Sequence, residues 1–231
     1  MADTYKTMIQ AANIYPDGHL DEKGVTIIEL IIATAIFSVV LLIVLYGFFY
    51  LTSVYIKGYV QSNTQETAVD IENQVTMDLE LSNGGVGSVY KLETASDGIS
   101  QGVCIGDNRY SFDLNEEYPD NTYYGLMVDT VSGCNGLTAA QSVTKLNPNE
   151  TGEELLGEHM RLGAFSVTPV SGQSGLYNVD ITVAYGSDSA FSSISSSAPY
   201  SYYCAPLSLG NNFCAVSPLQ MVVQQQVTGA Q

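Results

Sequence analysis

The sequence predicts an α+β protein in which a long N-terminal α-helix packs on an antiparallel β-sheet head. The helix is predicted by an uncharged apolar run between Glu29 and Lys57 and by an amphipathic stretch that continues it. The sheet is predicted by short alternating segments that begin after Gly84. We therefore expect four parts: a polar N-terminal segment (1–24), an apolar half-helix (25–52), an amphipathic half-helix (53–82) and a globular β-rich head (83–231).

The composition is acidic and yet mildly hydrophobic. The 231 residues carry a net charge of −17, while their mean hydropathy is +0.10. Seven Lys and Arg oppose twenty-four Asp and Glu, so the chain cannot line a phosphate track with cations, and we expect no direct nucleic-acid binding.

The apolar run is long enough to cross a bilayer, which takes roughly 20 residues. A secretory signal peptide would place its basic segment and apolar region at the very start of the chain. Here the run follows a mostly polar segment, and one acid, Glu29, lies at its head. A carboxylate in a membrane-spanning segment usually has a partner or a function. The alternative is that Glu29 simply benefits from the helix dipole in the first turn.

The segment KGVTIIELIIATAIFSVVLL, from Lys23 to Leu42, resembles the N-terminal signature of type IV prepilins and their type II secretion relatives. In that family a polar leader ends in a basic residue and Gly, and the fifth residue of the mature chain is Glu. Gly24 matches the Gly before the cleavage site, and Glu29 matches the fifth-position acid. Val25 stands where the family usually has Phe or Met.

The resemblance implies cleavage between Gly24 and Val25, N-methylation of Val25 and an assembly role for Glu29. It makes residues 1–24 a leader peptide and residues 25–52 a transmembrane and filament-core helix. In an apolar setting, the Glu29 carboxylate of one subunit would meet the Val25 ammonium of another, because either charge alone keeps its desolvation penalty. The implied partners are a prepilin peptidase, other pilin subunits, the inner-membrane pilus assembly machinery and, before assembly, membrane lipid. The chain would be a single-pass inner-membrane protein first, and part of an extracellular pilus or a periplasmic pseudopilus afterwards.

Beyond the lipid boundary an apolar stripe continues the helix. Its members recur at helical spacing, and acids occupy the other faces; the stripe consists of Val60, Ala68, Ile71, Val75 and Leu79. Asn83, Gly84 and Gly85 are expected to end the helix soon after Ser82.

In the head, Tyr177–Tyr185 alternates as a half-buried strand should, and Ala164–Thr168 precedes it across a Gly-rich turn, which predicts a hairpin. A final strand is predicted over Leu219–Val227, and weaker ones over 103–105, 110–112 and 123–128. Ser187–Ser201 is expected to be a flexible connection, with an exposed glycosylated or adhesive loop as the alternative.

All four cysteines fall in the head and include no Cys-x-x-Cys pair, which suggests two disulfides formed in an oxidising compartment. Three connectivities are possible, and free thiols are the alternative. Sequential pairing closes the shortest loops, so we favour Cys104–Cys134 and Cys204–Cys214.

Catalytic chemistry finds little support in the sequence. With His19 in the leader, cleavage would leave His159 alone, which argues against a Ser-His-Asp triad or a His-rich zinc site. We place His159 on the surface, in a short helix-like segment. Asp113–Glu117 offers oxygen ligands, but Tyr118 stands where a calcium loop needs Gly, so a solvated turn is expected. We expect no enzyme activity, no catalytic residue, no metal and no cofactor.

The sequence therefore favours a structural subunit of a type IV pilus-like filament, a minor pilin that serves adhesion, motility or DNA uptake as part of the filament. One alternative is a pseudopilin of a type II secretion system. Another is an uncleaved single-pass membrane-anchored adhesin or receptor.

Overall fold

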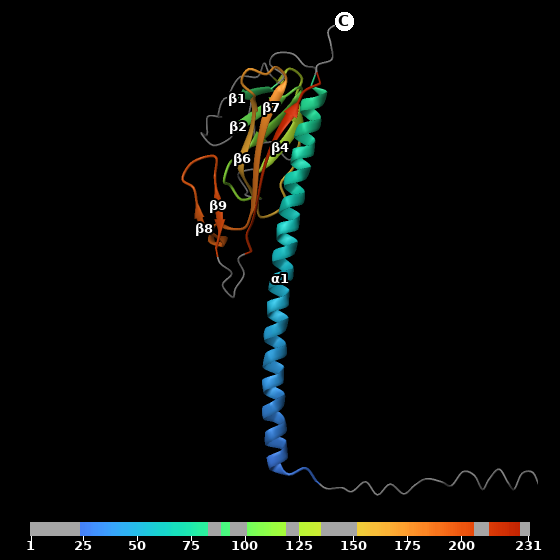
Figure 1. Cartoon of the computed structure of the whole chain (residues 1–231), viewed down its shortest axis with the longest axis vertical. Coiled ribbons are helices and arrows are strands. Elements are labelled where there is room, and N and C mark those ends of the chain that lie inside the picture. The colour runs from blue at the N-terminus through green and yellow to red at the C-terminus, as the bar shows by residue number, and fades with distance from the viewer. Residues whose placement is uncertain are drawn as a thin grey trace, which may run out of the picture. The chain divides into compact units, whose positions relative to one another are not determined.

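A computed structural model describes residues 24–82, 89–92, 101–118, 125–134, 152–205 and 213–226 (Figure 1). The chain forms two compact units, with the division between Tyr50 and Leu51. Of the expected leader, only Gly24 lies within the described residues.

A single helix, α1 (Ile27–Leu81), accounts for nearly all the structure before the head. It ends at Leu81, which confirms the predicted end of the helix. In the first unit, its apolar side chains are exposed around the whole circumference. Within the described residues, these apolar side chains are therefore left exposed. A helix of this kind needs lipid or the helices of other subunits to cover it.

In the second unit, one face of α1 is buried. All five residues of the predicted stripe lie on this face, which confirms the amphipathic pattern. Thr64 is buried with them, although it is polar. Its Oγ1 donates a hydrogen bond to the Val60 carbonyl at 2.8 Å, so its hydroxyl is satisfied within the helix.

The first sheet is antiparallel and has the order β1-β2-β3-β4-β5. Its strands are β1 (Val89–Leu92), β2 (Gln101–Ile105), β3 (Asn108–Phe112), β4 (Leu126–Thr130) and β5 (Glu153–Glu154). The three weaker predicted strands correspond to β2, β3 and β4, although Tyr123 and Tyr124 lie outside the described residues.

The second sheet has the order β10-β7-β6, and it contains the predicted hairpin. Its strands are β6 (Met160–Pro169), β7 (Leu176–Tyr185) and β10 (Ala215–Gln224). The predicted final strand begins too late, because β10 already pairs with β7 at Ala215. Pro218 lies inside β10, a position that a strand paired on only one side can accept. Val227 is outside the described residues.

The hydrophobic core lies between the buried face of α1 and the inner faces of both sheets. Phe165 of β6 contacts Tyr110 and Phe112 of β3, with ring centroids 5.5 and 5.1 Å apart. The Tyr110 hydroxyl donates a hydrogen bond to Asp78 of α1 at 2.5 Å. Burial, with the adjacent Asp78 carboxylate, raises the pKa of Tyr110, so the phenol stays protonated. Helix and sheets thus form one head.

The Ser-rich segment is more ordered than a flexible connection. After the short 3₁₀ helix η2 (Asp188–Ala190), it forms β8 (Phe191–Ile194), which pairs with β9 (Tyr202–Cys204). Figure 1 shows these two strands as a small separate hairpin. Its apolar contacts include Phe191 and Ile194 of β8 and Tyr202 of β9. Because Ser192 and Ser193 separate the two apolar residues of β8, the sequence shows no alternating strand pattern there.

Candidate assembly and processing site

The expected cleavage point lies before the helix and is accessible. Residues 24–26 precede the first helical turn and have no regular secondary structure. Val25 is 73% exposed, and a Cβ placed on Gly24 would meet no atom within 4 Å. A peptidase could therefore reach the Gly24–Val25 bond without unwinding the helix.

Glu29 is fixed at the head of α1 by Thr26. The Glu29 Oε2 accepts hydrogen bonds from the Thr26 backbone N–H and from the Thr26 Oγ1, both at 2.9 Å. In return, the Glu29 N–H donates to Thr26 Oγ1 at 3.3 Å. This reciprocal arrangement is a capping box, and it also explains why the helix starts at Ile27 and not at Val25. The sequence analysis missed Thr26, although the spacing Thr-x-x-Glu is its signature.

Beyond Glu29, α1 carries no charged side chain until Lys57. It is long and apolar enough to cross a membrane, and none of its most apolar window is buried. Between residues 24 and 56, the carboxylate of Glu29 is thus the one anionic side chain, and it lies at the head of an exposed apolar surface. Its Oε1 has no hydrogen-bond partner among the described residues.

Comparison with known protein families matches residues 20–45 to the prokaryotic N-terminal methylation motif. The chain therefore carries the N-terminal methylation motif, or class III signal peptide, of the type IV pilin and pseudopilin family. The matched segment contains Gly24, Val25 and Glu29. No curated protein and no solved structure matches the chain significantly. The long helix packed on antiparallel sheets gives the chain an α+β pilin-like architecture.

The head contains two disulfides. Cys104 is joined to Cys134, with Cα atoms 5.8 Å apart, and Cys204 is joined to Cys214, with Cα atoms 5.5 Å apart. No cysteine is free. The first bond is completely buried beside β2, whereas the second ties the end of β9 to the residue before β10. Both bonds belong to the part of the chain that would be exported.

Residues of the segment from Asp113 to Glu117 contact other residues of the head. Asn115 accepts a hydrogen bond from the Tyr202 hydroxyl at 3.1 Å, and Glu117 contacts Arg161 and His159. His159 is exposed as expected, but it lies in a turn and has a φ of 62°, so the helix-like interpretation of its segment is wrong. Within the described ranges, no group of three or more His, Cys, Asp or Glu is placed to hold a metal.

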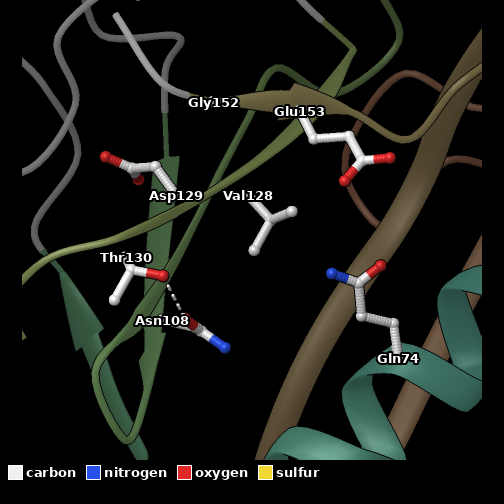
Figure 2. Close-up of a pocket in the computed structure, with 7 residues that line it drawn as sticks. All are labelled: Gln74, Asn108, Val128, Asp129, Thr130, Gly152 and Glu153. Atoms are coloured by element: carbon white, nitrogen blue, oxygen red, sulfur yellow. Dashed lines mark hydrogen bonds between the residues drawn. The ribbon is translucent and has the colours of Figure 1, made fainter.

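A pocket of about 410 Å³ lies between α1 and the first sheet (Figure 2). Its lining comes from Gln74, Asn108, Val128, Asp129, Thr130, Gly152 and Glu153. Thr130 donates a hydrogen bond to the Asn108 side-chain oxygen at 3.0 Å. Asp129 is already bound by Arg109, whose Nε lies 2.8 Å from it. The lining of this pocket contains no Ser, His or Cys, and its carboxylates are those of Asp129 and Glu153.

Proposed function

We propose that this chain is a structural subunit of a type IV pilus-like filament, specifically a minor pilin that is cleaved after Gly24 and polymerises through its hydrophobic helix. The observation that carries this proposal is the combination of the methylation motif with an exposed, uncharged helix that has one oriented carboxylate at its head. A solitary soluble domain would have no use for such a surface.

Assembly would be directed by a charge pair between subunits. Cleavage gives Val25 an α-ammonium, and N-methylation keeps its positive charge. Because Thr26 holds Glu29 through Oε2, Oε1 would remain available to the ammonium of an incoming subunit. In the apolar core of a filament each charge needs the other, so the pair would fix the axial offset between neighbouring helices.

The subunit would pass through two environments. Before assembly the helix would lie in the cytoplasmic membrane, where prepilin peptidase and the inner-membrane assembly machinery would act on it. Afterwards it would lie in the filament core, with the disulfide-bonded head outside. Adhesion, motility or DNA uptake would then be activities of the assembled filament.

A pseudopilin of a type II secretion system is the second candidate, because it shares the same methylation motif. The two proposals differ in where the head is found. A minor pilin lies on long surface filaments, whereas a pseudopilin stays in a short structure within the envelope.

Immunogold labelling with an antibody against the head tests this proposal. On intact cells and on sheared filaments, we expect gold particles on filaments, either at the tip or along the shaft. Label confined to the envelope of permeabilised cells would favour the pseudopilin. Label spread evenly over the membrane, with none in any filament, would contradict both assembly roles and favour a membrane-anchored adhesin or receptor.

A further inference from the structure

The charges of this acidic protein stop abruptly within the head. After Asp188, the sequence contains no Asp, Glu, Lys, Arg or His as far as Gln231. The segment that follows Asp188 includes the β8–β9 hairpin and is rich in Ser and Tyr. We call residues 187–205 the lobe. Its surface offers hydroxyl groups and aromatic rings beyond Asp188 but no ionised group.

The two faces of the hairpin differ in exposure. Phe191 and Tyr202 are buried, with ring centroids 5.0 Å apart, and they pack with Ala184. On the strand pair, Ser193 lies opposite Tyr203, and both are exposed. Tyr203 is 63% exposed. The outer face therefore presents the phenol ring of Tyr203 with the Ser193 hydroxyl on the opposite strand.

The lobe packs near Gly163 and Ala184 on the face of the second sheet that is opposite α1. Ile181 and Val183 of β7 point into the core with the helix, whereas the lobe contacts the alternate residue Ala184. Gly163 makes the contact possible, because a Cβ there would lie 2.6 Å from a Tyr202 ring carbon. The lobe is thus on the side of the sheet remote from the helix that leads to the filament core.

The lobe is held rigidly in place. Arg161, which is 2% exposed in its side chain, binds Asp188 at 2.7 Å and lies 5.2 Å from the centroid of the Phe191 ring. The Tyr200 N–H donates to the Gly163 carbonyl at 2.9 Å. The disulfide from Cys204 to Cys214 fastens the other end. A surface fixed before binding loses little conformational entropy when a partner arrives.

Hydroxyl groups on this face are available to a ligand. Ser195 is used internally, since its Oγ contacts the Ser197 and Pro199 carbonyls and accepts from the Ser201 N–H. By contrast, the side-chain hydroxyls of Ser193 and Ser196 have no hydrogen-bond partner within the described part of the chain. Combining Tyr with Ser supplies rigid contact area and adaptable hydrogen bonding, as in antibody paratopes.

We propose that the outer face of the lobe is a binding surface for neutral carbohydrate. A sugar ring has an apolar C–H face that can stack on Tyr203, and its hydroxyls can pair with the serines. Anionic glycans, nucleic acids and phosphates would find no cation there, and a cationic ligand would find only Asp188, which Arg161 already binds. The outward position of this surface rests on the proposed filament role, but the binding chemistry does not.

The test uses the full-length chain in a detergent without a sugar headgroup, passed over immobilised neutral polysaccharides: dextran, galactomannan and chitin. Immobilised heparin serves as the anionic comparison. The variants are Tyr203→Ala and Ser193→Asp, which places a charge opposite the ring. The matched control is Tyr59→Ala on α1, because Tyr59 is 64% exposed and lies outside the lobe. Near-UV circular dichroism checks that each variant is folded.

We expect retention on at least one neutral polysaccharide. Tyr203→Ala should weaken it about tenfold, since exposed aromatic anchors often dominate binding. Ser193→Asp should also weaken it, and Tyr59→Ala should leave it unchanged. Because no charge takes part, raising NaCl from about 50 to about 500 mM should have little effect.

Failure to bind any of the three neutral polysaccharides would overturn the proposal, as would binding that Tyr203→Ala leaves intact. Self-association of the chain that Tyr203→Ala abolishes, without polysaccharide binding, would assign the surface to a second copy instead. The measurement needs neither cleavage nor filaments. A chain that binds sugar but never enters a filament would thus refute the filament role alone.

Discussion

Leu79→Ala tests how firmly α1 is built into the head. Leu79 is 0% exposed and belongs to the core formed by the helix and both sheets. Truncating such a leucine removes its transfer free energy and leaves a cavity, which costs about 2 to 5 kcal/mol. For a head of this size, the midpoint of thermal unfolding should fall by about 5 to 15 °C. Near-UV circular dichroism of the detergent-solubilised full chain follows the unfolding of the head.

Met77→Ala provides the matched control on the same helix. Met77 is 54% exposed, so its truncation should change the free energy of unfolding by no more than about 0.5 kcal/mol. Equal shifts for the two variants would mean that the buried face of α1 is assigned wrongly. The packing of helix against sheet described above would then have to be abandoned.

The remaining predictions concern assembly, pH and the disulfides. Glu29→Gln should preserve cleavage and membrane levels but remove the chain from sheared filaments; normal incorporation by quantitative immunoblot would refute the charge pair. Burial raises the pKa of Glu154, against the opposing backbone N–H groups of Leu126, Leu156 and Gly125. The wild-type chain should therefore lose stability relative to the Glu154→Gln variant as the pH rises from 4.5, the ordinary pKa of Glu, through the raised pKa of Glu154. A gain in relative stability over the same pH range would show that the backbone N–H groups outweigh burial. Replacing both cysteines of the Cys104–Cys134 pair by Ser should cost about 1 kcal/mol more than the same change in Cys204–Cys214, because their separations are 30 and 10 residues; chemical denaturation showing the reverse order would refute this loop-entropy argument.

The spacing of apolar residues in the sequence located the main elements of the fold, because a helix or strand with one buried face has apolar residues at regular intervals. Apart from Thr64, the stripe from Val60 to Leu79 is apolar at helical spacing, and the strand from Tyr177 alternates as far as Val183, so both elements were predictable. The burial of Thr64 was not predictable, since a hydroxyl that donates a hydrogen bond within its own helix can be buried although the residue is polar. The start of β10 was missed because Pro218 conceals a strand that is paired on one side.

The motif at Gly24, Val25 and Glu29 is local, and the sequence alone was sufficient to find it.

The position of the lobe was not predictable, because it depends on contacts between distant residues. Arg161 reaches Asp188 and Glu117, and Tyr202 reaches Asn115 across the head. No short-range pattern encodes a buried guanidinium with partners on three segments. Two consecutive serines also hid β8, because they interrupt the alternation of apolar and polar residues that a strand usually shows.

The proposed filament role requires that the chain be processed at Gly24–Val25 before it assembles through α1. Mass spectrometry of the N-terminal peptide, from the membrane-extracted and filament-associated protein, determines whether this happens. We expect a peptide that begins at Val25 and carries an N-methyl group. A chain that still begins at Met1 or Ala2 in both fractions would contradict it and would leave an uncleaved membrane-anchored protein.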